Sequence, residues 1–179
     1  MKPKEITKKI LKILLTASAL TLAFSSPYFF VNLLNNKKYK YPKKKVARTF
    51  HYLKQKGLIK YKRKGRQIYI SLTPLGRKYA QELQIDDLKI ETQRRWDGKW
   101  RILIFDINEK WKIVREALRG KLKELGFFQL QKSVWICPFP CENEFKILKT
   151  FFNLPNKSFM FIVATKIPFE EELKKIYNL

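Results

Sequence analysis

The stretch PKKKVARTFHYLKQKGLIKYKRKGRQIYISL, residues 42–72, changes its periodicity at Gly57 and decides the fold of the first half of the chain. Before the glycine, apolar residues recur at spacings of four and three, which predicts a helix over residues 42–57. Its core stripe consists of Val46, Phe50 and Leu53. After the glycine, residues 58–61 and 67–72 have the pattern of two strands around a basic tip. The sequence therefore predicts a helix followed by a cationic β-hairpin.

The segments on either side of this stretch add further helices. Apolar spacing predicts helices over residues 4–23 and 27–35, and Thr73 with Pro74 forms a start signal for a helix over residues 75–83. Three helices, a cationic hairpin and a closing helix make a winged helix-turn-helix. We expect this domain to occupy residues 1–83.

Charge is concentrated in the same half of the chain. The formal net charge is +24, and the residues up to Arg95 carry 24 lysines and arginines against five acidic residues, whereas the remainder carries 15 against ten. Residues 37–66 hold fourteen basic residues and no acidic one. Such an excess favours a polyanionic partner, nucleic acid above all. The structural alternative is that these lysines only keep a small domain in solution.

Helix and hairpin together predict how duplex DNA is contacted, because a helix fits the major groove and basic side chains on a hairpin reach phosphates. The predicted groove contacts are Lys44, Lys45, Arg48, Tyr52 and Gln55. The predicted phosphate contacts at the wing are Lys62, Arg63, Lys64 and Arg66. The single histidine, His51, lies among the groove residues and is interpreted as a surface contact.

Residues 13–34 are mostly apolar, so a membrane span is an alternative for this segment. Polar residues interrupt it, and Ser26 with Pro27 reads as a helix start, so we expect two short helices and no membrane insertion.

Two cysteines, Cys137 and Cys141, and one histidine do not supply a usual zinc site. A strained bridge or a redox switch is an alternative for these two thiols, which flank Pro138, Phe139 and Pro140. We expect buried free thiols without a function and a reducing, cytoplasmic setting.

The second half reads as a small α+β sandwich of the ferredoxin-like type, occupying residues 96–179 after a linker at 84–95. We expect strands and helices to alternate, with a last strand or a partner chain completing the sheet. The predicted strands are 101–107, 129–139 and 159–166, and the predicted helices are 110–125, 141–152 and 168–177. Four tryptophans, at positions 96, 100, 111 and 135, are interpreted as packing residues.

Several motifs of this half carry a resemblance when they are taken in order. They are WDGKWR at residues 96–101, FDI at 105–107, LGF at 125–127 and LQKSVW at 130–135. In this order they resemble the central domain of the PaaX-like transcriptional repressors, which is itself similar to the small CRISPR-associated endonuclease. The resemblance implies a homodimer joined through residues 96–179, which presents two winged helices to a duplex and represses transcription.

Asp106 carries the main alternative. The resemblance to the nuclease places it where a strand-end aspartate faces its counterpart across a dimer axis and binds Mg²⁺, which prefers carboxylate oxygens. The simpler interpretation is an aspartate that caps the following turn, and we expect no catalysis and no cofactor. A third hypothesis is a CRISPR-adaptation or architectural subunit that holds DNA by its backbone alone, without reading sequence.

Overall fold

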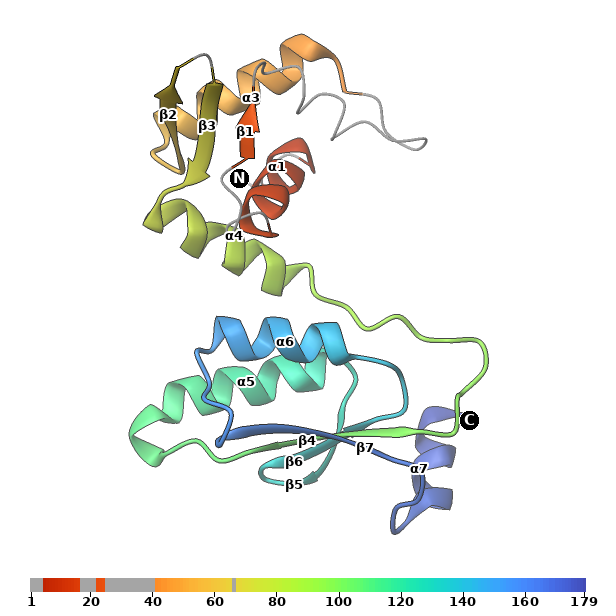
Figure 1. The fold of residues 1–179 in the computed structure, drawn as a ribbon. Coiled ribbons are helices and arrows are strands. Elements are labelled where there is room, and N and C mark those ends of the chain that lie inside the picture. Colours follow the sequence, from red (N-terminus) through yellow and green to blue (C-terminus); the bar gives the residue numbers. More distant parts are fainter. Residues whose placement is uncertain (1–4, 17–21, 25–40, 66) are drawn as a thin grey trace. The chain divides into compact units, whose positions relative to one another are not determined.

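The computed structural model describes residues 5–16, 22–24, 41–65 and 67–179, and of residues 22–24 and 64 it describes the main chain (Figure 1). The chain divides into two compact units, Met1–Asp86 and Asp87–Leu179. Each unit combines helices with an antiparallel sheet, so the predicted α+β class is confirmed. No helix within the described residues is long and apolar enough to cross a membrane.

The first unit packs helices against a three-stranded sheet of order β1-β3-β2. Its described elements are α1 (Glu5–Thr16), β1 (Leu22–Phe24), α3 (Lys43–Gln55), β2 (Ile59–Lys64), β3 (Gln67–Leu72) and α4 (Pro74–Asp86). The predicted stripe of α3 is buried, and it joins Ile6, Ile10 and Leu14 of α1 and Ile70 of β3 in one core. The helical spacing of apolar residues thus sets which face of each helix is covered.

The first predicted helix is too long. Helix α1 ends at Thr16, whose hydroxyl donates to the main-chain carbonyls of Lys12 and Ile13. Residues 22–24 form β1 instead, which pairs antiparallel with β3. Three apolar residues are too few for periodicity to separate strand from helix, and the pairing supplies main-chain partners at the edge of β3. The helix predicted over residues 27–35 lies outside the described residues.

Thr73 fastens the hairpin to α4, as its role of N-cap predicts. Its hydroxyl donates to the Gly57 carbonyl at 2.6 Å and accepts from the Gly76 N–H at 3.0 Å. The Thr73 N–H donates to the carbonyl of Leu58 at 3.1 Å. A Cβ on Gly76 would lie 1.8 Å from the Leu58 oxygen. The main chains of α4 and of the hairpin base therefore touch where only a glycine fits.

The second unit is a four-stranded antiparallel sheet of order β5-β6-β4-β7, with the chain order strand, helix, strand, strand, helix, strand of a ferredoxin-like sandwich. Its elements are β4 (Trp100–Phe105), η2 (Glu109–Trp111), α5 (Lys112–Glu124), β5 (Phe128–Gln131), β6 (Val134–Cys137), α6 (Glu142–Phe151), β7 (Phe159–Ala164) and α7 (Glu170–Tyr177). In the first unit, before this sandwich begins, α4 continues to Asp86, three residues past the end of the helix predicted over residues 75–83.

The strand predicted over residues 129–139 is wrong as a single element. A turn at Lys132 and Ser133 splits it into β5 and β6, which pair with each other with a bulge between Gln129 and Gln131. The turn lacks the glycine, asparagine or aspartate that usually marks a hairpin, so the sequence pattern does not reveal it. The fourth strand therefore comes from the chain itself rather than from a partner.

Both faces of this sheet are apolar. Helices α5 and α6 cover one face, where Arg119 lies over the Phe105 ring and Phe145 stacks on Phe159 at 4.7 Å (Figure 1). Helix α7 covers one end of the other face through Leu173, which packs with Trp100 and Ile136. The Tyr177 hydroxyl accepts from the Phe128 N–H and lies within hydrogen-bond distance of the Gly126 and Ile136 carbonyls, which fastens α7 to the sheet.

The close approach at Gly76 makes the first prediction. We expect Gly76→Ala to destabilise the first unit by about 2 kcal/mol or more, because backbone atoms must shift to admit the methyl group. Circular dichroism during thermal unfolding measures the loss. All four tryptophans lie in the second unit, so tryptophan fluorescence should report an unchanged second unit.

Gly120→Ala in α5 is the matched control, because nothing lies within 4 Å of its added Cβ. A glycine in the interior of a helix costs about 0.5–1 kcal/mol relative to alanine, so this variant should raise the fluorescence-detected midpoint. Equal tolerance of both substitutions would contradict the close contact at Gly76.

Candidate nucleic-acid interface

Helix α3 presents the predicted groove residues to solvent. Val46, Phe50 and Leu53 are buried, while the remaining face is exposed. The exposed side chains include all five predicted contacts, Lys44, Lys45, Arg48, Tyr52 and Gln55, and also His51. Between residues 41 and 65 there is no acidic side chain. The exposed face of α3 is therefore cationic along its length, and its orientation is set by the buried stripe.

The end of α3 turns the chain directly into β2. Gly57 has a left-handed φ of 66°, and its N–H donates to the Lys54 carbonyl at 2.9 Å. The Leu58 N–H reaches back to the Leu53 carbonyl at 2.9 Å. These two bonds satisfy carbonyls that the end of a helix leaves open, and a residue with a side chain is strained at this φ. The hairpin thus follows α3 after a tight turn at residues 56–58.

The hairpin carries Lys62 and Arg63, two of the predicted wing residues, toward its far end. β2 and β3 pair in register from Ile59 with Leu72 to Lys64 with Gln67. Lys62 and Arg63 are exposed, and Arg63 donates from Nε to the Gly65 carbonyl at 3.3 Å. The side chain of Lys64 and residue Arg66 lie outside the described part of the chain. The structure places two of the four predicted wing side chains on the exposed hairpin.

Two lysine–tyrosine contacts also lie on this surface, and neither was predicted from the sequence. Lys56 Nζ lies 5.9 Å from the centre of the Tyr52 ring, and Lys54 Nζ lies 5.4 Å from that of Tyr61. Burial raises the pKa of the Tyr61 hydroxyl, so that ring is neutral. Tyr52 and Lys56 are four apart on one helix, which periodicity can reveal. The contact between α3 and β2 depends on the Gly57 turn, which periodicity cannot reveal.

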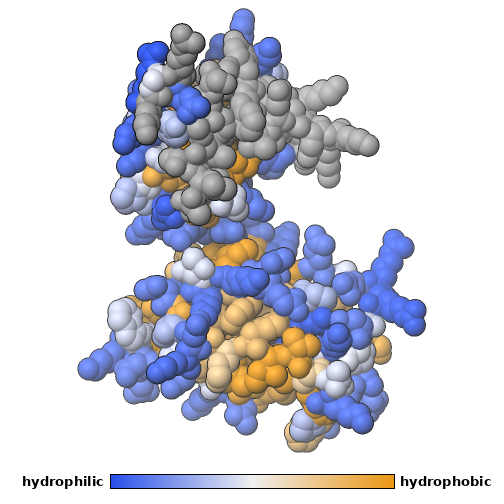
Figure 2. Space-filling model, viewed as in Figure 1, coloured by the Kyte–Doolittle hydropathy of each residue, from blue (hydrophilic) through white to orange (hydrophobic). Residues whose placement is uncertain are grey.

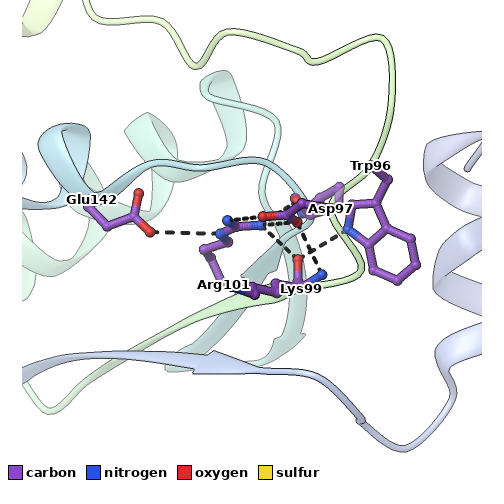
Figure 3. A network of polar contacts seen from close by, with 6 residues as sticks. Trp96, Asp97, Lys99, Arg101 and Glu142 are labelled. Atoms are coloured by element: carbon purple, nitrogen blue, oxygen red, sulfur yellow. Dashed lines mark hydrogen bonds and ion pairs between the residues drawn. The ribbon is translucent and has the colours of Figure 1, made fainter.

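In the second unit, a buried guanidinium organises the WDGKWR motif (Figure 3). Arg101 in β4 is 4% exposed, and its two terminal nitrogens bind the Asp97 carboxylate at 2.6 and 2.7 Å. It also donates to the carbonyls of Lys99 and Pro138, and Glu142 lies 3.9 Å away. The Arg101 hydrogen bond lowers the pKa of Asp97, and Asp97 raises that of Arg101. This network has the geometry of a structural clamp.

Asp106 is exposed just after β4, and its N–H donates to the Ser158 carbonyl at 2.9 Å. Of its neighbours, Asn108 accepts from the Lys110 N–H, and the Glu109 carboxylate lies 3.8 Å from Arg115. Within the described residues, no group of three or more histidine, cysteine, aspartate or glutamate side chains could hold a metal ion. The described residues of one chain therefore do not form a metal site around Asp106.

Taken together, a basic helix-and-hairpin unit is joined in this chain to a ferredoxin-like sandwich. Residues 93–175 match the family described as the PaaX protein central Cas2-like domain. The second unit therefore matches the PaaX central domain over residues 93–175, and the resemblance seen in its motifs is confirmed.

The other comparisons add little. A solved structure titled uncharacterized protein Rv0674 from Mycobacterium tuberculosis is 17% identical, with a TM-score of 0.36, over 98% of this chain and 68% of that one. No curated protein matches.

The Asp97 clamp makes the second prediction. We expect Asp97→Asn to lower the free energy of unfolding of the second unit at pH 7 by about 2 kcal/mol, the usual worth of hydrogen bonds to a charged group. Because the pKa of Asp97 is depressed on folding, its contribution is complete well above pH 4 and is lost as the pH falls below about 4.

The gap between wild type and Asp97→Asn should therefore narrow as the pH is lowered from about 7 to 3, as measured by urea unfolding with tryptophan fluorescence. Asp106→Asn is the control, because an exposed carboxylate should change stability by less than about 0.5 kcal/mol. A gap that stays constant with pH would show that Asp97 does not act through its charge.

Proposed function

We propose that this protein is a DNA-binding transcriptional regulator of the PaaX-like kind, a repressor that acts in the cytoplasm. The first unit is its winged helix-turn-helix, which lays α3 in the major groove and the β2–β3 hairpin along the phosphate backbone. The observation that carries the proposal is the exposed surface of α3 and the hairpin, which has no acidic residue. The buried stripe of Val46, Phe50 and Leu53 orients α3 so that its basic face points to solvent.

The chemistry of that surface suits a duplex. Lysines and arginines that neutralise phosphates release condensed counterions, which supplies affinity without sequence preference. Arg48 and Gln55 on the helix have the donors that pair with guanine and adenine edges in the major groove. The match of residues 93–175 to a domain named for the PaaX protein supports regulation over a purely architectural role. Sequence preference is what separates these two roles.

The partner in this proposal is a second copy of the chain, bound through the surface around β7. β7 is an edge strand, paired on one side only with β4. Met160 and Ile162 are 46% and 44% exposed on the face opposite α5 and α6, and Val163 is 47% exposed on the other face. Figure 2 shows hydrophobic side chains gathered at the level of this strand.

An uncharged apolar edge strand is uncommon on a protein that stays monomeric, because it offers both open hydrogen-bonding groups and apolar area to another chain. A second copy pairs identical surfaces about a two-fold axis, which closes the assembly. Two first units are then available for two half-sites of a palindromic operator. Occupying a promoter in this way blocks transcription.

Neutralising the wing makes the third prediction. Substituting Lys62, Arg63, Lys64 and Arg66 together by glutamine should weaken binding of all duplexes alike, and should reduce the slope of log K against log salt by about 3 to 4. Fluorescence anisotropy at several salt concentrations measures both. The control substitutes four exposed lysines of the second unit, Lys110, Lys146, Lys157 and Lys166, which changes the charge equally.

Arg48→Ala should instead relax preference at particular base pairs, at a cost of about 1–3 kcal/mol against the best site. Selection from random duplexes reveals the preference, and including Mg²⁺ with a check for cut DNA tests for metal-dependent cleavage at the same time. If neither set of changes alters binding, α3 and the hairpin are not the DNA surface.

The β7 surface makes the fourth prediction. Replacing Met160 and Ile162 by lysine should convert a dimer into a monomer, because two charges on each copy would have to be buried. Sedimentation velocity measures the mass. Ile113→Lys on α5 is the control, since Ile113 is 86% exposed and lies away from β7. An unchanged mass for the double variant would place the dimer interface elsewhere.

A further inference from the structure

Two thiols meet in the turn that joins β6 to α6. Cys137 ends β6, Cys141 precedes α6, and Pro138, Phe139 and Pro140 lie between them. Each cysteine is 1% exposed and neither is in a disulfide. The Cys141 thiol donates a hydrogen bond to the Cys137 sulfur. The two sulfurs are therefore in contact inside the second unit, and the proposed function does not use them.

The two sulfurs have different surroundings. The Cys137 sulfur accepts hydrogen bonds from the Cys141 thiol and from the Phe139 N–H. The positive charge of the Arg101 guanidinium also favours the thiolate form of Cys137. Arg101 and Cys137 are register partners on adjacent strands, and Arg101 donates to the Pro138 carbonyl at 2.9 Å. The hydrogen bond from Cys141 lowers the pKa of Cys137, although burial opposes it, whereas the same bond raises that of Cys141. One member of the pair is a better thiolate and the other a proton donor.

We propose that Cys137 and Cys141 form an oxidation site, which hydrogen peroxide or a similarly small peroxide converts reversibly into an intramolecular disulfide. The Cys137 thiolate attacks one peroxide oxygen, the O–O bond breaks, and the sulfur becomes a sulfenic acid while the other oxygen leaves as water after taking a proton. The Cys141 sulfur then attacks the Cys137 sulfur, the S–S bond forms, and the hydroxyl leaves as a second water. The two sulfurs lose two electrons to the peroxide, and a dithiol reductant restores both thiols.

Burial limits which reagents reach this site. A peroxide is about the size of water and can enter through a small local opening of the turn, whereas a maleimide or an aromatic disulfide reagent needs a much larger one. The native protein should therefore resist the bulky reagents and still react with peroxide. The oxidised turn closes a ring of five residues, two of which are prolines, so the disulfide removes little freedom from the unfolded chain. We expect the fold to be unchanged by oxidation.

The test uses the full-length native protein, treated with hydrogen peroxide, quenched, alkylated and digested with trypsin. Residues 133–146 form one tryptic peptide that contains both cysteines and no methionine. We expect this peptide to lose two hydrogens and to regain them with dithiothreitol, while the untreated native protein does not react with a maleimide. Native protein that keeps both thiols, or that gains two oxygens on Cys137 without losing the hydrogens, would overturn the proposal.

Two single variants form a matched pair that assigns the roles. Cys141→Ser keeps a hydroxyl donor beside Cys137, so peroxide should leave a sulfenic acid on Cys137 that dimedone traps. Cys137→Ser removes the thiolate that attacks the peroxide and leaves Cys141 alone, so no dimedone adduct should form. Equal labelling of both variants would show that the sulfurs are not differentiated and would refute the assigned order. Because the readout is the mass of one peptide, the result is independent of whether the protein binds DNA.

Discussion

The second unit depends on one buried cation, the guanidinium of Arg101 in its central strand. A charge at 4% exposure needs partners, and Asp97, Lys99 and Pro138 accept hydrogen bonds from its two terminal nitrogens, while Nε lies 3.9 Å from the Glu142 carboxylate. These partners come from the loop before β4 and from the turn after β6. One side chain therefore fixes the entrance to the sheet and the cysteine turn together. The motif WDGKWR supplies the residues of this clamp.

The two units differ in their charge and in where their apolar residues lie. The first concentrates basic side chains outside a small apolar core and leaves acidic residues out of α3 and the hairpin. The second carries a smaller excess, 15 basic against ten acidic residues after Arg95, and has apolar residues on both faces of its sheet. A strongly cationic surface repels a second copy of itself, which agrees with the proposal that the second unit forms the dimer.

The sequence predicted those features that depend on periodicity. Val46, Phe50 and Leu53 mark α3 because their helical spacing repeats over about two turns. Thr73 marks the start of α4 because capping is local. It could not predict β1, which is three residues long, or the turn at Lys132 and Ser133. Contacts between segments were also beyond it. Lys54 against Tyr61, and Cys137 against Cys141, depend on turn geometry that has no repeating pattern.

The contact between Gly76 and Leu58 has a mechanical consequence. Two main chains in van der Waals contact have no rotatable side chains between them, so the base of the hairpin and α4 behave as a single stiff piece. Helix α4 is also the last element of the first unit, and its end at Asp86 is where the chain passes into the second. A tilt of the hairpin is therefore carried to the start of the connecting segment with the length of α4 as its lever arm.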